Sequence, residues 1–251
     1  MSKRFDLDGK RVLVTGASAG LGVHFARTLA GAGASLVLAA RRVERISTLC
    51  ADLSRGGKEA RAIALDVTSE TSIAAALEAA GPLDIVVNNA GISIVKPALD
   101  MPVADWDSVV STNLRGAWLV AQGAARRWVA DRRPGIVVNV ASILGLRTIG
   151  QVAPYNASKA GLIHLTRALA MEWARHKIRV NAICPGYIET EMNEDFWKTP
   201  GGQRLIERIP QRRIGRPEDL DGALLLLASN AGAFMTGSVV TVDGGHTVNS
   251  L

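Results

Sequence analysis

Short runs of branched aliphatic residues alternate along this chain with segments of helical length. The first run is Arg11–Thr15, and the segment 21–32 after it carries Leu21, Phe25 and Leu29 at the spacing of one helix face. Similar runs follow at 35–39, 62–65, 83–87, 135–140, 178–182 and 238–242. Strands that are buried on both faces and separated by helices indicate a parallel sheet covered on each side. We therefore predict an α/β fold with a doubly wound, seven-stranded parallel sheet.

The length of 251 residues suits one α/β domain, and no long linker or internal repeat divides it. We expect a single domain over 1–251. The segment 187–215 departs from the rhythm because it is longer, more polar and interrupted by Pro-Gly-Gly, which favours a substrate lid. The N-terminal residues contain no apolar signal core, no apolar run approaches the length of a membrane span, and two distant cysteines form no disulfide framework. These features predict a cytoplasmic protein.

The formal net charge of +6 raises the question of nucleic acid, but the basic residues are scattered and aromatic residues make up only 4% of the chain. No basic stripe interleaved with aromatic residues is present, so we expect no nucleic-acid partner and no membrane partner. The four histidines have no metal-ligand spacing, and we expect no metal. The basic residues 132–133 and 175–177 are compatible with docking of an acidic acyl carrier, although a solvated surface is the simpler explanation for them.

A glycine-rich turn, Thr-Gly-Ala-Ser-Ala-Gly-Leu-Gly at 15–22, follows the first predicted strand. Glycines allow a tight turn and a close backbone approach to phosphate, and the N-terminus of the next helix offers free N–H groups. The same residues also match the G-x-S-x-G turn of serine hydrolases. That alternative fails on order, because the hydrolase turn needs an oxyanion donor from an earlier strand and none precedes this one.

Tyr155 and Lys159 lie four residues apart, and Ser142 precedes Tyr155 by thirteen residues. In a helix this spacing places the ammonium group one turn from the phenol. A tyrosine has an ordinary pKa of about 10, and a neighbouring cation lowers it by favouring the phenolate. The pair therefore suggests a tyrosine that transfers a proton, although two solvated residues on a helix share the same spacing.

Further segments stand in a fixed order around this pair: N-N-A-G at 88–91, Asn113, Pro-Gly at 185–186 and V-D-G-G at 242–245. With the glycine turn, this set resembles the short-chain dehydrogenase/reductase family over nearly the whole chain. Within that family it is similar to the 3-oxoacyl-carrier-protein reductase-like branch, through P-G-Y-I-E-T-E-M at 185–192. The resemblance implies a Rossmann-type domain and an oxidoreductase that interconverts a ketone and a secondary alcohol by hydride transfer.

The resemblance also implies roles for single residues. Tyr155 would exchange a proton with the substrate, Lys159 would lower the pKa of Tyr155 and bond the nicotinamide ribose, Ser142 would hold the substrate oxygen, and Asn113 would position a water of the proton relay. The expected cofactor-binding residues are Gly16, Ser18, Gly20, Leu21, Gly22, Arg41, Arg42, Asp66, Val67, Asn89, Ala90, Gly91, Tyr155, Lys159, Pro185, Gly186, Ile188 and Thr190. The expected substrate contacts are Ser142, Leu144, Tyr155, Tyr187 and Phe196.

The end of the second predicted strand indicates which nicotinamide cofactor is used. NAD-dependent enzymes place an acidic residue there, whereas this chain has Ala40 followed by Arg41 and Arg42. A guanidinium pairs well with a 2′-phosphate, so we predict NADP(H), although either arginine could instead cap the next helix or face solvent.

The substrate is not readable beyond a small carbonyl compound or alcohol. Apolar residues in the lid fit a hydrophobic or 3-oxoacyl ketone, and the alternatives are an NAD-dependent sugar or alcohol dehydrogenase of the same family and, more distantly, a non-catalytic nucleotide-sensing module. The resemblance further implies a homotetramer, with helices around Trp118 and Leu165 as interface candidates.

Overall fold

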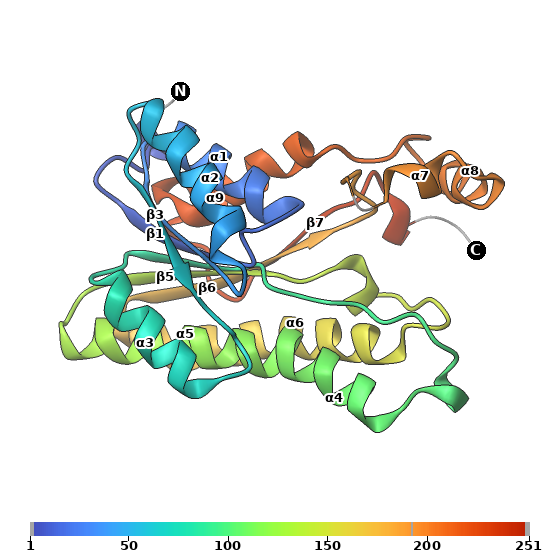
Figure 1. Ribbon diagram of the computed structural model, residues 1–251, viewed down its shortest axis with the longest axis horizontal. Coiled ribbons are helices and arrows are strands. Elements are labelled where there is room, and N and C mark those ends of the chain that lie inside the picture. Colours follow the sequence, from blue (N-terminus) through green and yellow to red (C-terminus); the bar gives the residue numbers. More distant parts are fainter. Residues whose placement is uncertain (1–2, 192, 249–251) are drawn as a thin grey trace.

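The computed structural model describes residues 3–191 and 193–248 and contains the predicted sheet. Seven strands lie in the order β3-β2-β1-β4-β5-β6-β7, and every neighbouring pair is parallel (Figure 1). The strands are β1 (Arg11–Thr15), β2 (Ser35–Ala40), β3 (Ala60–Ala64), β4 (Ile85–Asn88), β5 (Gly135–Val140), β6 (Ile178–Pro185) and β7 (Val239–Val242). The prediction of a doubly wound parallel sheet is confirmed.

Helices cover both faces of the sheet (Figure 1). One face carries α1 (Leu21–Gly31), α2 (Val43–Arg55) and α9 (Asp221–Ala228), and the other carries α3 (Glu70–Ala80), α5 (Ala117–Ala130) and α6 (Ala153–Trp173). Each layer closes its own apolar core, with Phe25 and Leu29 fully buried on the first face and Trp128 buried on the second. The shorter helices α4 (Val103–Val110), α7 (Glu194–Trp197) and α8 (Pro200–Glu207) lie at one end of the molecule, at the right in Figure 1.

Several strand boundaries differ from the sequence prediction, and at two of them pairing with a neighbour, rather than local composition, sets the boundary. β3 begins two residues earlier than expected, since Ala60 and Arg61 pair with β2. β6 continues to Pro185, since its last four residues pair with the whole of β7. The extension carries the chain directly to the Pro-Gly turn at the carboxyl edge of the sheet.

The strand order reverses between β1 and β4, where the crossover connections leave in opposite directions. In open α/β sheets, ligands bind in the crevice that this reversal opens beyond the carboxyl ends of the strands. The glycine turn follows β1 and the N-N-A-G segment begins at the end of β4, so the topology itself brings these two motifs together.

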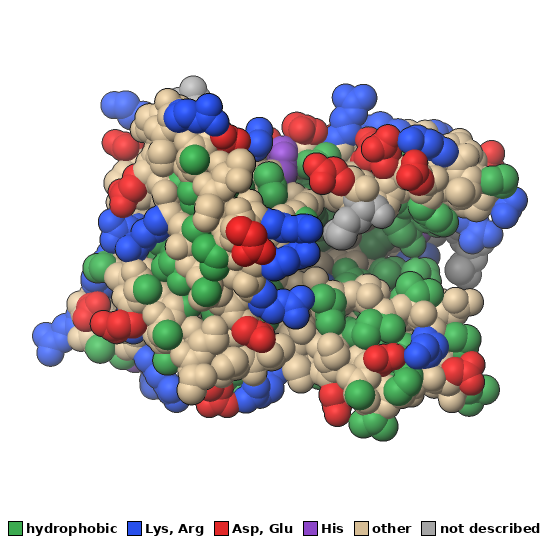
Figure 2. Space-filling model, viewed as in Figure 1, with side chains coloured by type: hydrophobic (Ala, Val, Ile, Leu, Met, Phe, Trp, Pro, Cys, Tyr) green, Lys and Arg blue, Asp and Glu red, His purple; other side chains and the backbone are tan. Residues whose placement is uncertain are grey.

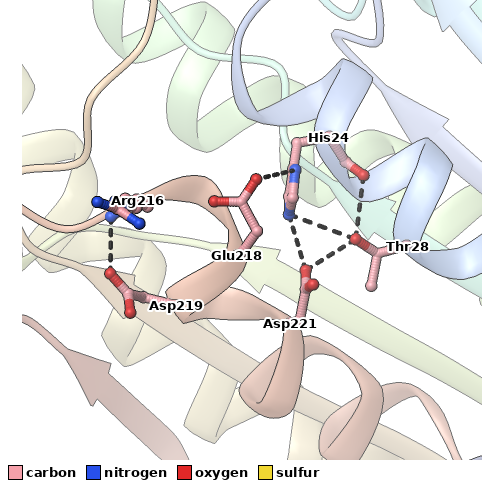
Figure 3. Close-up of polar contacts among 6 residues, drawn as sticks. All are labelled: His24, Thr28, Arg216, Glu218, Asp219 and Asp221. Carbon is pink, nitrogen blue, oxygen red and sulfur yellow. Dashed lines mark hydrogen bonds and ion pairs between the residues drawn. The ribbon is translucent and has the colours of Figure 1, made fainter.

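A polar bridge fastens α1 to α9 (Figure 3). The Asp221 carboxylate accepts a hydrogen bond from the Thr28 hydroxyl at 2.7 Å and lies 2.7 Å from His24 Nε2. Glu218 adds a carboxylate oxygen 3.9 Å from His24 Nδ1. The bridge therefore holds the helix that begins at the glycine turn.

The two ends of the segment 187–215 are hydrogen-bonded to each other. Glu189 N–H donates to the Gly215 carbonyl at 2.8 Å, and Gly215 N–H donates to the Tyr187 carbonyl at 3.0 Å. Close by, the guanidinium of Arg213 binds both carboxylate oxygens of Asp219, at 2.6 and 3.0 Å. Met192, inside this segment, lies outside the described residues. Across 3–191 and 193–248, no helix has the length and apolar character to cross a membrane.

Candidate active site

A cleft of about 580 Å³ opens at the carboxyl edge of the sheet. Figure 2 shows the hollow between the arm that carries α7 and α8 and the layer that carries α4, with hydrophobic side chains on its inner walls. The predicted residues that line it are Gly16, Ser18, Gly20, Leu21, Arg41, Arg42, Asp66, Val67, Asn89, Ala90, Gly91, Ser142, Tyr155, Lys159, Pro185, Gly186, Tyr187, Ile188 and Thr190. Residues from the ends of six different strands thus meet in one cavity.

The glycine turn is fixed against the N-N-A-G segment. Gly16 has φ +66°, and a Cβ at this position would lie 2.7 Å from Ala90 Cα, so only glycine fits. The Thr15 hydroxyl accepts hydrogen bonds from the backbone N–H groups of Asn89 and Ala90, both at 3.1 Å. Backbone without side chains therefore lines this part of the cleft, beside the N-terminus of α1. Such a surface suits the pyrophosphate of a dinucleotide.

Gly22 is the one predicted glycine of this turn that does not line the cleft. Its Cβ would lie 2.3 Å from the Gly16 carbonyl oxygen, so the missing side chain allows α1 to pack closely behind the turn.

Arg41 and Arg42 stand exposed on the rim of the cleft. Within the part of the chain that the structure describes, neither guanidinium has a carboxylate within 4.0 Å. Arg42 occupies the N-cap position of α2 but makes no side-chain cap bond. The carboxylate of Asp66 is instead held by the backbone N–H and hydroxyl of Thr68, at 2.9 and 2.7 Å, and these bonds lower the pKa of Asp66. Two cations are therefore available to an anionic ligand.

Tyr155 and Lys159 lie on the first turns of α6, with the Lys159 ammonium 5.6 Å from the centre of the Tyr155 ring. Lys159 is buried, and its Nζ donates to the Val140 carbonyl at 2.7 Å. The Ser142 hydroxyl lies within reach of the Tyr155 phenol and influences its pKa. It also accepts a hydrogen bond from Leu144 N–H at 3.1 Å. A substrate oxygen placed between Ser142 and Tyr155 would meet two hydroxyl donors.

The protonation of this pair differs from the expectation. Burial raises the pKa of Tyr155 above its usual value, and the hydrogen bond with Ser142 opposes this only in part. Burial also lowers the pKa of Lys159 to about 8. The predicted lowering of the Tyr155 pKa by Lys159 is not seen in the free protein, because burial penalises the charged form of both groups and the ammonium is bonded to the Val140 carbonyl.

Asn113 does not line the cleft but is buried directly behind it, in a π-helical turn, η3 (Ser111–Gly116), between α4 and α5. Its amide oxygen accepts from Ile92 N–H at 2.8 Å, and its amide nitrogen donates to the Ile92 carbonyl at 2.9 Å and to Ser158 Oγ at 3.1 Å. A Cβ built on Gly91 would lie 3.3 Å from Asn113 Oδ1 and 3.5 Å from Lys159 Nζ. Asn113 therefore fixes the cleft wall beside Lys159, in the kind of turn that marks functional sites.

Of the predicted substrate contacts, Leu144 and Phe196 do not line the cleft. Phe196 packs on Trp197, whose ring in turn contacts Tyr187 at 5.8 Å between centroids, so Phe196 supports the wall from outside. Leu144 meets the site through its backbone N–H.

The cleft also contains polar residues that the sequence interpretation missed, namely Thr68, Ser93, Thr112 and Asn193. Asn193 organises the loop after the Pro-Gly turn, since it accepts from Thr190 N–H at 2.8 Å and donates to the Ile188 carbonyl at 2.9 Å. An asparagine just before a short helix is the available signal, because such residues commonly bond the nearby backbone.

Cys184 and the basic residues 132–133 and 175–177 do not line the cleft. Cys184 is fully buried, and burial raises its pKa to about 11, so its thiol packs in the core in the protonated form. The basic residues 132–133 and 175–177 precede β5 and β6 and therefore lie at the amino edge of the sheet, opposite the cleft. There Arg133 bonds Asp84 at 3.0 Å.

The fold, the cleft and the Ser-Tyr-Lys arrangement define one class of protein: the chain belongs to the short-chain dehydrogenase/reductase family and is an oxidoreductase. A family model described as enoyl-(acyl carrier protein) reductase matches residues 16–247. Gluconate 5-dehydrogenase of Gluconobacter oxydans is 38% identical over 98% of this chain and 97% of its own length. A 3-oxoacyl-[acyl-carrier-protein] reductase of Aquifex aeolicus is 37% identical over 95% of this chain and 98% of its own.

A crystal structure of gluconate 5-dehydrogenase from Burkholderia cenocepacia, in complex with NADP and tartrate, superposes with a TM-score of 0.94. It is 36% identical and covers 98% of each chain. Two further similar structures also hold NADP. These comparisons confirm the predicted family and enzyme class, and they agree with NADP(H) as the cofactor.

Proposed function

We propose that this enzyme interconverts a ketone and a secondary alcohol with NADP(H), through Ser142, Tyr155, Lys159 and Asn113. The observation that carries the proposal is that Ser142 and Tyr155 line the same cleft, with the buried Lys159 ammonium 5.6 Å from the centre of the Tyr155 ring. Two hydroxyl donors that converge on one point stabilise the negative charge of a carbonyl oxygen as it is reduced.

The bound cofactor would supply or accept the hydride, and its oxidised ring carries a positive charge. Tyr155 donates a proton to the carbonyl oxygen during reduction and removes one from the alcohol during oxidation. Its raised pKa keeps it protonated in the free enzyme, which suits it to act as the acid of the reductive direction. The Lys159 ammonium is a cationic donor close to the phenol. The hydrogen bond between Asn113 and Ile92 keeps the Gly91–Ile92 part of the cleft wall beside this ammonium.

NADP(H) is assigned over NAD(H) on the guanidiniums of Arg41 and Arg42, which line the cleft and have no carboxylate within 4.0 Å among the residues that the structure describes. They follow β2, where a 2′-phosphate would lie, and the carboxylate of Asp66, which lines the same cleft, is engaged by Thr68. A guanidinium forms strong charge-assisted hydrogen bonds with phosphate oxygens.

The substrate class that we propose is a polyhydroxylated ketone or alcohol, including sugar acids. The relatives with this chemistry support it, among them the two gluconate 5-dehydrogenases. A carrier-bound 3-oxoacyl substrate is less well supported, because the basic residues suited to an acidic carrier lie at the amino edge of the sheet, far from Tyr155. The prediction of a hydrophobic ketone thus gives way to its sugar-dehydrogenase alternative, with NADP(H) retained.

A substrate panel tests this proposal. The enzyme is assayed for NADP⁺ reduction with D-gluconate, D-glucitol and galactitol, and for NADPH oxidation with 5-keto-D-gluconate and an acetoacetyl thioester. We expect turnover on the polyhydroxylated compounds at a kcat/KM at least tenfold above that of the thioester. Exclusive activity on the thioester would overturn the substrate class while leaving the oxidoreductase assignment intact.

Two further features of the functional protein are proposals. The segment 187–215 acts as a lid, because its two ends are bonded to each other while the arm that carries α7 and α8 borders the hollow in Figure 2. Self-association as a homotetramer through α5 and α6 is supported by the half-buried Trp118 and Leu165 and by Met171, which is 80% exposed. Light scattering on the purified protein tests the assembly, and a monomeric mass at micromolar concentration would contradict it.

A further inference from the structure

Three polar side chains form a hydrogen-bonded chain between the sheet and the helices α5 and α6. Asn88 and Asn139 lie in register on the neighbouring strands β4 and β5, and Asn88 Nδ2 donates to Asn139 Oδ1 at 3.0 Å. Asn139 Nδ2 donates to the hydroxyl of Thr166 on α6 at 2.9 Å, and that hydroxyl donates to the Leu162 carbonyl at 2.8 Å. All three polar side chains are buried, and none of them lines the cleft.

The two ends of this chain are attached to the two elements that carry the proposed catalytic groups. At one end, Asn88 Nδ2 also donates at 3.0 Å to the carbonyl of Ala117, the first residue of α5, directly after the π-helical turn η3 that holds Asn113. At the other end, Thr166 lies about two helical turns beyond Lys159 and on the same face of α6. One buried chain therefore ties both η3 and α6 to the same pair of strands.

α6 is hydrogen-bonded to β5 at two points. Lys159 Nζ donates to the Val140 carbonyl at 2.7 Å, and Asn139, the preceding residue of the strand, donates to Thr166. Apolar packing alone permits small slides and rotations of a helix on a sheet, because the hydrophobic effect has no direction. A hydrogen bond weakens steeply when its angle is lost, so it fixes one position. The bond from Asn139 thus holds α6 in place even when Lys159 exchanges its own partner during the reaction.

Stability does not require polar residues at these positions. When apolar groups of the same shape replace both partners of a buried hydrogen bond, the effect on stability is close to neutral or favourable. The chain also leaves Asn88 Oδ1 buried without a hydrogen-bond partner among the described residues, and such atoms are rare in folded proteins because they are unfavourable. What the chain supplies is therefore a defined position of the helix on the sheet.

We infer that Asn139 and Thr166 are positioning residues of the reaction, which hold the catalytic side chains of α6 in one geometry beside Ser142. These side chains are Tyr155 and Lys159, so the inference rests on the proposed function. A misplacement of about 1 Å, caused by a mutation far from the reacting atoms, can cost about 10²-fold in rate. Asn139 and Thr166 lie outside the cleft and act only through the helix that they hold.

Two variants of Thr166 separate positioning from packing. Thr166→Val keeps the shape and removes the hydroxyl, whereas Thr166→Ser keeps the hydroxyl and removes a fully buried methyl group. With the best substrate of the panel above, we expect Thr166→Val to lower kcat roughly 10–100-fold and to leave NADPH binding almost unchanged. Thr166→Ser should keep most of the wild-type kcat, although the lost methyl leaves a cavity that lowers stability. A loss of kcat in Thr166→Ser that equals or exceeds the loss in Thr166→Val would indicate a packing role and overturn the inference.

Asn139→Ala breaks the same link from the strand. Because a shared bond can be removed only once, Asn139→Ala combined with Thr166→Val should lose no more kcat than the larger of the two single losses. Ser229→Ala is the control, since the Ser229 hydroxyl is also buried and accepts from Ala231 N–H at 3.2 Å, between α9 and β7. It should lower stability in urea and keep the wild-type kcat. Losses that multiply in the double variant, or a similar loss of kcat in Ser229→Ala, would contradict the inference.

A spectroscopic titration without turnover keeps this inference distinct from the proposed function. The chain has two tyrosines, so a Tyr187→Phe background leaves Tyr155 as the only phenol. The Ser142 hydroxyl lowers the pKa of Tyr155 against the effect of burial, and a displaced α6 weakens this influence. In this background, the ultraviolet absorbance of the phenolate should therefore appear at higher pH with Thr166→Val than with Thr166→Ser.

The titration is recorded over the pH range in which circular dichroism shows both variants folded. If the wild-type enzyme turns over no compound of the panel, the proposed function fails, and the titration still decides whether Thr166 positions Tyr155. Indistinguishable phenolate titrations of the two Thr166 variants overturn the inference, whatever the substrate.

Discussion

The carboxylate of Asp221, the first residue of α9, lies 2.7 Å from Nε2 of His24 on the first turn of α1 (Figure 3). The same oxygen accepts a hydrogen bond from Thr28, one turn further along α1. Since α1 begins at the glycine turn, one carboxylate fixes the position of the helix that faces the cofactor cleft. Stability and cofactor binding are therefore linked through a contact outside the cleft.

We expect Asp221→Ala to lower the free energy of unfolding by about 1–2 kcal/mol, because two hydrogen bonds are lost at a partly exposed site. Because α1 loses its anchor, the KM for NADPH should rise severalfold. Urea unfolding and steady-state kinetics measure the two effects. Asp221→Asn retains an acceptor and should lose less of both, whereas a fully stable Asp221→Ala enzyme with unchanged KM would contradict the link.

Tyr155→Phe removes the proton donor while preserving the ring. We expect kcat to fall by about 10²–10⁴-fold, the usual contribution of a positioned general acid. NADPH binding, followed through quenching of protein fluorescence, should remain within a few-fold of wild type. A variant that keeps the wild-type kcat would show that another group transfers the proton.

Arg41→Ala and Arg42→Ala should each weaken the preference of the enzyme for NADPH over NADH. A charge-assisted hydrogen bond to the 2′-phosphate predicts a loss of roughly 10–100-fold in kcat/KM for NADPH at the arginine that makes it, with NADH nearly unaffected. Arg45→Ala is the matched control, because Arg45 is an exposed arginine of the same segment that does not line the cleft. Equal losses with NADPH and NADH would instead indicate a general role in folding α2.

The buried Lys159 predicts a pH dependence of stability. Its pKa is about 8 in the folded enzyme against 10.5 for a free lysine, so between these values the unfolded state binds more protons than the folded state. Stability should therefore rise with pH across this window, by up to about 3 kcal/mol from this group, and the full cost of burying the charge applies below pH 8.

Lys159→Met tests this dependence, because methionine fills the space without a titrating group. The free energy of unfolding, measured in urea at pH 7.5 and 9.5, should increase for wild type and change less for the variant. Parallel curves for the two proteins would show that the pKa of Lys159 is close to that of a free lysine.

Most of the fold and most of the residues that line the cleft could be predicted from local sequence. The seven aliphatic runs predicted the sheet, because strands buried on both faces need continuous apolar residues whatever their neighbours are. The glycine turn, N-N-A-G and Pro-Gly motifs marked the strand ends, because backbone geometry at those positions excludes other residues. Gly16 is the clearest case, since a Cβ there would meet Ala90.

The tertiary structure decided what depends on neighbours distant in sequence. Pairing with β7 extended β6, burial raised the pKa of Tyr155 against the expected effect of Lys159, and the packing of Trp197 displaced Phe196 from the cleft wall. The ring contact between Tyr187 and His246, at 5.3 Å between centroids, joins residues 59 positions apart in the chain and has no local signature. Sequence by itself determined the fold and the reacting groups, since motifs and periodicity are local; solvation, charge balance and substrate contacts arise only when the folded chain brings separate segments together.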